Sequence, residues 1–287
     1  MFHNLLEKID RWSSSDFSTA TLEVRKYIDT CPRNIYLDIL MQIGIIPESI
    51  ELDSTQEKLF SKASDAVLSR AFREIGLKST VLKERADSAD VLAESIYHGY
   101  TLVADAKAFR LSRTAKNQKD FKVTALSGWR NDSDYAVLCS PYFQYPTSIS
   151  QIYAQAVDNN VCLFSWEHLV FLIEHSVTES PALNLSNLWN ISAVHAEQCV
   201  VSKKKKNFVP MVDATVQELG TTSFKDFLLE CKNTITSRAN EETDFWKNEI
   251  TRINSYTKEQ AIEELIRAKK IDEKIAQIQK YVTGIKI

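Results

Sequence analysis

The sequence has 287 residues, of which 44% are hydrophobic and 25% are charged, and its formal net charge is -3. With only six glycines and six prolines, it excludes a disordered chain, and no apolar run reaches the roughly 20 residues of a membrane helix. The five cysteines are scattered without a CxxC pair, which argues against a zinc site or a disulfide framework. We therefore expect a globular protein of a reducing cytoplasm, with no membrane contact.

The first 50 residues are predicted to form a helical N-terminal region. Apolar residues in 4–30 recur at helical spacing, and the polar cluster Ser13–Asp16 interrupts them and can cap a second helix. A third helix, residues 35–43, is predicted to end at Gly44, because glycine readily adopts the backbone conformation that ends a helix.

A long amphipathic helix follows this region. Ser54 or Thr55 can cap it, an apolar stripe runs from Leu59 to Phe72, and Gly76 ends it. Glu57 falls in its first turn, where a carboxylate complements the helix dipole. Glu57 is therefore either a capping carboxylate or a glutamate that the helix directs toward an active site.

The middle of the chain predicts a mixed sheet with helices on both faces. Runs of apolar and β-branched residues that suit strands occupy residues 79–82, 90–95, 100–109, 135–139 and 161–164. Helices are predicted between and after these strands, because apolar residues recur at helical spacing in 116–129, 149–157 and 165–173. The second and third strands are expected to form a hairpin around His98 and Gly99. The fold class is therefore α/β, in the α+β sense, with a central mixed β-sheet flanked by helices.

Two acids and one lysine at this hairpin form the candidate site. Residues i and i+2 of a strand point to the same face, so Asp105 and Lys107 should converge while Ala106 turns away. Asp90 begins the neighbouring strand, and two carboxylates with the backbone carbonyl of Ala106 could bind a hard cation such as Mg²⁺. A bound cation lowers the pKa of its bound water, and a lysine can orient that water for attack. The pattern therefore suits phosphodiester hydrolysis.

The residues after this site carry concentrated positive charge. From Lys107 to Lys122 the chain has six basic residues and one acid, Asp120, for a local net charge of +5. A basic segment in an otherwise acidic protein suits a groove that holds phosphate. The four lysines 203–206 are either a solvated loop or a second, non-specific phosphate contact.

Several segments together resemble the HindIII family of type II restriction endonucleases. They are Ser54–Ala63, Leu102–Lys122, Asp134–Leu138, Phe143–Pro146 and Leu163–Leu169. The resemblance implies a restriction-endonuclease-like core of the PD-(D/E)xK type over residues 51–175, with helical regions at 1–50 and 176–287 in one domain. It also implies a prokaryotic, cytoplasmic homodimer that depends on Mg²⁺, with Mn²⁺ as a substitute, and cuts the duplex palindrome AAGCTT after the first A. Ala89 stands where the family motif has a proline.

The resemblance also assigns roles to single residues. Asp90 and Asp105 match the metal-binding carboxylates, Lys107 the catalytic lysine, and Lys122 a further lysine that faces the site. The segment expected to contact DNA contains Arg110, Arg113, Thr114, Lys116, Asn117 and Lys119. An asparagine such as Asn117 can form two hydrogen bonds with N6 and N7 of adenine in the major groove, whereas the basic residues would divide between phosphate and guanine. No role follows for Glu84.

Other functions from different classes remain open at this level. A nuclease of the same core could cut DNA without sequence preference or act in repair, and a catalytically silent protein could bind the site without cutting it. No glycine-rich phosphate loop is present, so we expect no ATP dependence. The helical pattern from Phe224 to the end requires a partner for its apolar stripe, either the body of the domain or a second subunit.

Overall fold

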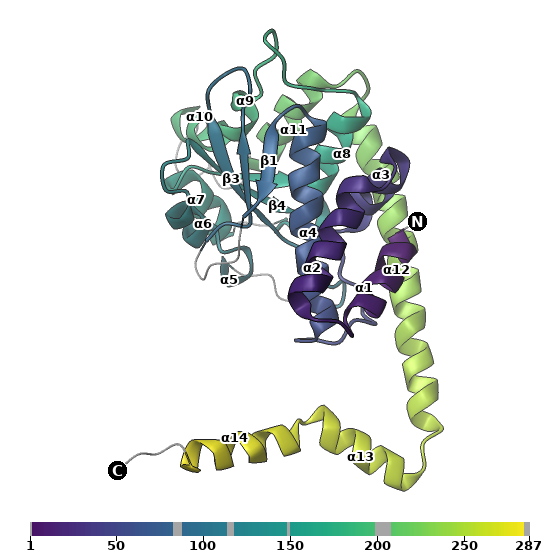
Figure 1. The fold of residues 1–287 in the computed structure, drawn as a ribbon. Helices are drawn as coiled ribbons and strands as arrows, with labels where there is room; N and C mark the ends of the chain where they lie inside the picture. The colour runs from purple at the N-terminus through teal and green to yellow at the C-terminus, as the bar shows by residue number, and fades with distance from the viewer. Residues whose placement is uncertain (1, 83–87, 114–117, 148–149, 199–207, 284–287) are drawn as a thin grey trace. The chain divides into compact units, whose positions relative to one another are not determined.

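A computed structural model describes residues 2–82, 88–113, 118–147, 150–198 and 208–283 (Figure 1). Thr114, Lys116 and Asn117 of the predicted DNA-contacting segment lie outside these described residues, as do Glu84 and lysines 203–206. The chain forms two compact units, residues 1–237 and residues 238–287.

A five-stranded mixed sheet lies at the centre of the first unit, as predicted. Its strands are β1 (Lys78–Val81), β2 (Val91–Glu94), β3 (Thr101–Ala106), β4 (Tyr135–Ser140) and β5 (Val161–Ser165). They lie side by side in sequence order; β1, β2 and β3 pair antiparallel, and β3, β4 and β5 pair parallel. Every residue of β5 is buried, which agrees with the continuous apolar run that a strand covered on both faces requires.

Helices surround this sheet. Before it come α1 (Phe2–Trp12), α2 (Phe17–Thr30), α3 (Arg33–Gln42) and α4 (Thr55–Glu74). Between its parallel strands lie α5 (Gln118–Phe121), α6 (Val123–Trp129), the 3-10 helix η1 (Tyr142–Gln144) and α7 (Gln151–Asp158). After it come α8 (Trp166–Glu174), α9 (Ser186–Trp189), α10 (Ile191–Gln198), α11 (Phe208–Leu219) and α12 (Phe224–Asn254). In Figure 1, α4 lies beside β1, and it packs against β1, β2 and β3.

The long helix α4 has the predicted signals at both ends. The Ser54 hydroxyl accepts a hydrogen bond from the backbone N–H of Glu57 at 3.1 Å, which satisfies one of the free N–H groups at the helix start. Gly76 follows its end with a φ of 92°, where an added Cβ would lie 2.9 Å from backbone atoms of Glu179. Only glycine fits that position without strain.

Three predicted elements differ in extent from the observed ones. The helix expected over 116–129 is described as two short helices that join at Lys122, whose φ of 51° is incompatible with a continuous α-helix. The strand expected to reach Phe109 leaves the sheet after Ala106, because Phe109 pairs instead with Ile45 of the loop before α4. The helix expected from Phe224 onward is interrupted near residues 257 and 270 and becomes three helices.

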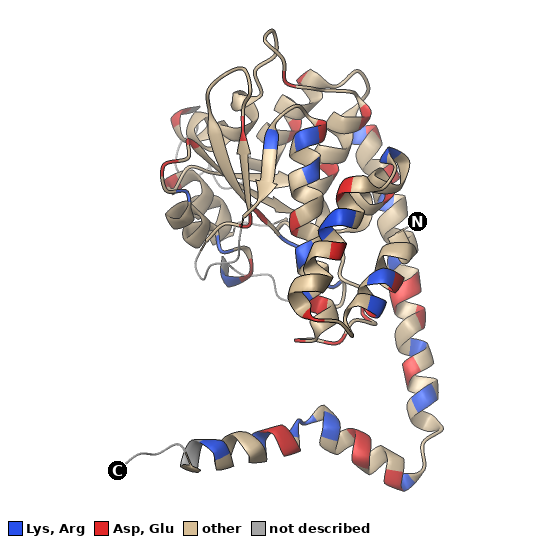
Figure 2. Ribbon diagram, viewed as in Figure 1, with Lys and Arg blue, Asp and Glu red and all other residues tan. Residues whose placement is uncertain are grey.

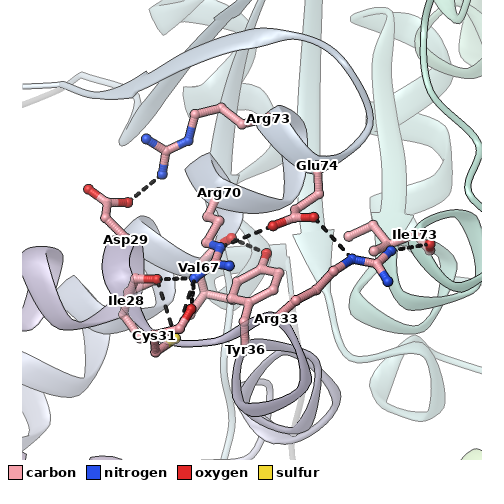
Figure 3. Close-up of polar contacts among 10 residues, drawn as sticks. All are labelled: Ile28, Asp29, Cys31, Arg33, Tyr36, Val67, Arg70, Arg73, Glu74 and Ile173. Carbon is pink, nitrogen blue, oxygen red and sulfur yellow. Dashed lines mark hydrogen bonds and ion pairs between the residues drawn. The ribbon is translucent and has the colours of Figure 1, made fainter.

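Arg70 on α4 joins the N-terminal helices to the body of the fold (Figure 3). One of its guanidinium nitrogens, Nη1, donates to the backbone carbonyls of Ile28 at 2.6 Å and Cys31 at 2.8 Å. Its Nε donates to Glu74 at 3.2 Å, and the guanidinium lies 4.2 Å from the centre of the Tyr36 ring. These contacts hold the end of α2 against the helix that covers the sheet.

The second unit contains the end of α12, then α13 (Lys258–Ala268) and α14 (Ile271–Thr283). Acidic and basic residues alternate along α13 and α14 (Figure 2), while apolar side chains there remain exposed. Exposed apolar residues in these two helices are Ile262, Leu265, Ile266, Ile271, Ile275 and Ile278. None of the described helices of the protein combines the length and apolar character that crossing a lipid bilayer requires.

We predict that Arg70→Lys lowers the free energy of unfolding by about 2 kcal/mol, because a single ammonium cannot reproduce the charged hydrogen bonds of the guanidinium. Urea denaturation measures this change. Arg73→Lys is the matched control: Arg73 pairs with Asp29 at a site where both side chains are at least 40% exposed, so its cost should stay below about 1 kcal/mol. Equal losses in the two variants would contradict the anchoring role of Arg70.

Candidate active site

The pairing of β2 with β3 places the two predicted acids side by side. Val91 lies opposite Ala104, and the backbone N–H of Asp90 donates to the Ala104 carbonyl at 3.2 Å. Asp90, immediately before β2, is therefore adjacent to Asp105 in β3, and the two side chains share a hydrogen bond. Asp105 is only 4% exposed, so this contact forms in a poorly solvated environment.

Lys107 completes the predicted group. Its ammonium forms an ion pair with Oδ2 of Asp105, as the two-residue period of an extended chain requires. Its backbone is fixed on both sides: the N–H donates to the Cys139 carbonyl at 2.8 Å, and the carbonyl accepts from the Trp166 indole at 2.9 Å. The lysine is thus held at the end of β3 by the neighbouring strand and by the first residue of α8.

Negative charge is concentrated at this point of the sheet. The pKa of Asp90 is raised to about 8, first by burial and then by the charges of Asp65 and Asp105 and the hydrogen bond with Asp105, while Lys107 opposes the shift. Burial likewise raises the pKa of Asp65 to about 6, against the effect of Lys62. In the metal-free chain the raised pKa favours an Asp90 that keeps its proton at neutral pH and donates it to Asp105, because two adjacent carboxylates in a buried site cannot both remain ionised cheaply.

Asp65 is the one member of this group that sequence reasoning missed. It lies on α4, is 1% exposed, and forms an ion pair with Lys62 at 3.3 Å. In the sequence it is a single acid within the apolar stripe of a long helix, between Ser64 and Ala66. An acid on the buried face of a helix needs a partner. The position of Asp65 within the apolar stripe was therefore the sequence signal that could have identified it as a site residue.

The arrangement fits a divalent cation. Oδ2 of Asp105 is buried, and no described residue donates a hydrogen bond of acceptable geometry to it; the Lys107 ammonium only lies against it as an ion pair. No set of three or more His, Cys, Asp or Glu side chains in the described ranges is arranged to hold a metal ion. The two carboxylates would therefore share the cation with a backbone carbonyl, water and substrate, as Mg²⁺ sites commonly do.

The other predicted site residues lie around this centre without joining it. Glu57 pairs with Arg110 at 2.5 Å and also accepts the N–H of Asp53. Arg113 forms an ion pair with Asp120. Lys119 and Lys122 are exposed, on α5 and before α6, and no described hydrogen bond or ion pair joins Lys122 to the carboxylates.

The chain is similar to known proteins over nearly its whole length. The family model described as HindIII restriction endonuclease matches residues 3–282. The type II restriction enzyme HindIII of Haemophilus influenzae (strain ATCC 51907 / DSM 11121 / KW20 / Rd) is 43% identical over 285 residues, which cover 98% of this chain and 95% of that enzyme. Among solved structures, restriction endonuclease FokI aligns with a TM-score of 0.38 and 13% identity, over 61% of this chain and 33% of that one.

We predict that Asp90→Asn stabilises the metal-free protein at alkaline pH. The pKa of Asp90 is raised from 3.8 to about 8, so between these values the folded chain retains a proton that the unfolded chain has lost. Stability should therefore fall as pH rises from 4 toward 8, and an amide, which donates to Asp105 without titrating, should remove that loss.

Thermal melting in EDTA between pH 5.5 and 8.5 measures the effect. The melting temperature of the wild-type protein should decrease across this range more than that of the variant. Asp132→Asn, at an exposed position, is the control and should follow the wild type. Parallel curves for wild type and Asp90→Asn would contradict the shared proton.

Proposed function

This chain belongs to the HindIII restriction endonuclease family, and on that basis we propose that it cuts double-stranded DNA at AAGCTT, after the first A of each strand. As a family member it is a type II site-specific deoxyribonuclease, a hydrolase that acts on phosphodiester bonds. The proposed hexamer is supported by 43% identity to HindIII over nearly the whole of both chains. The observation that carries the chemistry is the convergence of Asp90, Asp105 and Lys107 at the end of β3.

Asp90 and Asp105 would hold Mg²⁺, or Mn²⁺ in its place, together with the carbonyl of Ala106. Such a cation, when bound, supplies Lewis-acid stabilisation of charge on the phosphate and a more acidic water. The choice of a hard cation is supported by the donor set, which consists of carboxylate and carbonyl oxygens.

Lys107 would orient the attacking water and stabilise negative charge on the phosphate. Its ion pair with Asp105 and the two hydrogen bonds to its backbone support this role, because they fix the ammonium at the edge of the carboxylate pair. Water attacks phosphorus, the bond from phosphorus to the 3′ oxygen breaks, and that oxygen takes a proton. The products are a 5′-phosphate and a 3′-hydroxyl, with 5′ overhangs.

Sequence would be read by the segment that follows the catalytic lysine. Asn117 is suited to bond adenine N6 and N7 in the major groove, and Thr114, Arg113, Lys116 and Lys119 are suited to phosphate or guanine. Lys122, exposed before α6, would face the phosphate backbone. The support for this assignment is the concentration of positive charge beside the candidate active site.

We also propose a homodimer, in which each subunit cuts one strand. A palindrome has two-fold symmetry, and two identical subunits related by the same symmetry meet it in equivalent ways. The exposed apolar side chains of α13 and α14 support a second copy as partner, because such stripes rarely remain in contact with water. Membership of a bacterial restriction family supports the prokaryotic cytoplasm as the location.

The function predicts a specific digestion product. With Mg²⁺, the wild-type protein should linearise a plasmid that carries one AAGCTT and leave a plasmid without it intact, and sequencing the ends locates the cut. Comparable cutting of both plasmids would indicate a nuclease without sequence preference.

Lys107→Ala tests the mechanism in the same assay. Cleavage should fall at least about a hundredfold, since a preorganised group that stabilises the transition state is lost. Binding to the site, measured by gel shift with Ca²⁺, should persist. Lys78→Ala, which removes an exposed lysine paired with Glu94, is the control and should cut normally. Wild-type turnover by Lys107→Ala would remove that residue from the mechanism.

A further inference from the structure

Two segments distant in sequence are joined beside the candidate active site. The first is the stem, residues 107–113, which begins at the proposed catalytic lysine and forms the first part of the basic segment 107–122. The second is the anchor loop, residues 44–53, which connects α3 to α4. Their backbones pair: the Phe109 N–H donates to the Gly44 carbonyl at 3.0 Å, and the Ile46 N–H donates to the Phe109 carbonyl at 3.2 Å.

Glu48 of the anchor loop holds the far end of the stem. One carboxylate oxygen accepts the backbone N–H of Ser112 at 3.0 Å, and the other accepts the Ser112 hydroxyl at 2.9 Å. Glu48 is only 8% exposed, so these bonds to a charged group form with little competition from water. Two bonds to one residue fix both the backbone and the side chain of Ser112, two positions before the basic segment continues at Thr114.

Glu57 provides a second attachment, through Arg110. The Arg110 guanidinium pairs with Glu57 at 2.5 Å and donates to the Ile50 carbonyl at 2.7 Å, while Glu57 also accepts the Asp53 N–H at 2.7 Å. The Arg110 and Glu57 side chains are 17% and 20% exposed. Arg110 therefore uses its charge and two donors within the protein, which is a poor arrangement for neutralising a DNA phosphate.

We propose that Glu48 and Glu57 are positioning residues for sequence recognition. Arg110 acts with them as a structural link and not as a phosphate contact. Together the three residues fix the stem, so that the residues after it meet the bases in one register. Discrimination between similar sites requires recognition groups that cannot readily shift, since a segment with freedom to move re-packs onto several sequences. Because the stem begins at Lys107, the same attachments keep the recognition segment in register with the scissile phosphate. The inference rests on the proposed function.

The test compares kcat/KM on a duplex with AAGCTT and on duplexes with single-base changes. Glu48→Ala and Arg110→Ala should each reduce this discrimination roughly tenfold or more, comparable to the loss of one base contact. Glu57→Ala should do the same, and Glu57→Ala combined with Arg110→Ala should cost no more than either alone, since both remove one attachment. Glu94→Gln, in an exposed pair with Lys78, is the control and should keep wild-type discrimination.

A second measurement distinguishes a structural role of Arg110 from a contact with DNA. The slope of log affinity against log salt should be the same for Arg110→Ala and the wild type, whereas loss of one phosphate contact in each subunit of the proposed homodimer would reduce the slope by about 1.8. That reduction would overturn the role given to Arg110.

A fall in activity and melting temperature with unchanged discrimination would show that the attachments only stabilise the fold, and would overturn the proposal. If Glu48→Ala does not fold, Ser112→Ala removes only one hydrogen bond and should still lower discrimination. If the wild type cuts another hexamer, that hexamer serves as the reference site. A wild type that cuts no duplex contradicts the proposed function itself, which is a different outcome from unchanged discrimination in an active enzyme.

Discussion

The repulsion between two carboxylates at adjacent strand ends is the constraint around which the first unit is built. Asp90 and Asp105 are brought together by the β2–β3 register, and the third acid, Asp65, adds to their negative field. Burial makes this repulsion stronger than it would be in water. In the metal-free protein, a shared proton and the Lys107 ammonium reduce the repulsion between the carboxylates. A divalent cation would reduce the same repulsion with more positive charge.

The surrounding structure holds these groups where they repel each other. Hydrogen bonds inside the β2–β3 pair fix the two strand ends, and the Trp166 indole fixes the backbone of Lys107. The helix α4 carries Asp65 against the sheet, and Arg70, nearer the C-terminal end of α4, holds that helix against α2. Residues far from the chemistry thus contribute to it by holding the functional groups in position.

The parts of this site that could be predicted from the sequence are those set by the short repeat of a regular strand or helix. The Asp105 and Lys107 contact follows from the two-residue repeat of a strand, and the hairpin around Gly99 then brings Asp90 beside them. The start and end of α4 followed from Ser54 and Gly76, whose chemistry is local.

Contacts between distant segments were beyond such patterns. Glu57 and Arg110 are 53 residues apart, so their pairing depends on how α4 crosses the sheet and not on any local repeat. Asp65 was missed because its place in an apolar stripe indicates a buried acid that needs a partner, but not that the partners lie at β2 and β3. The helix break at Lys122 depends on a positive φ, which a lysine rarely adopts. The residues around Lys122 gave no sign of this break in the sequence.

The shared proton can be counted directly. Calorimetric titration of the protein with Ca²⁺ and a cognate duplex at pH 7, in buffers of different ionisation enthalpy, gives the number of protons released when the cation binds. Displacement of the proton between Asp90 and Asp105 predicts about one proton released, falling toward zero in Asp90→Asn. Cation binding without proton release in the wild-type protein would contradict the claim that Asp90 and Asp105 hold a proton that the cation displaces.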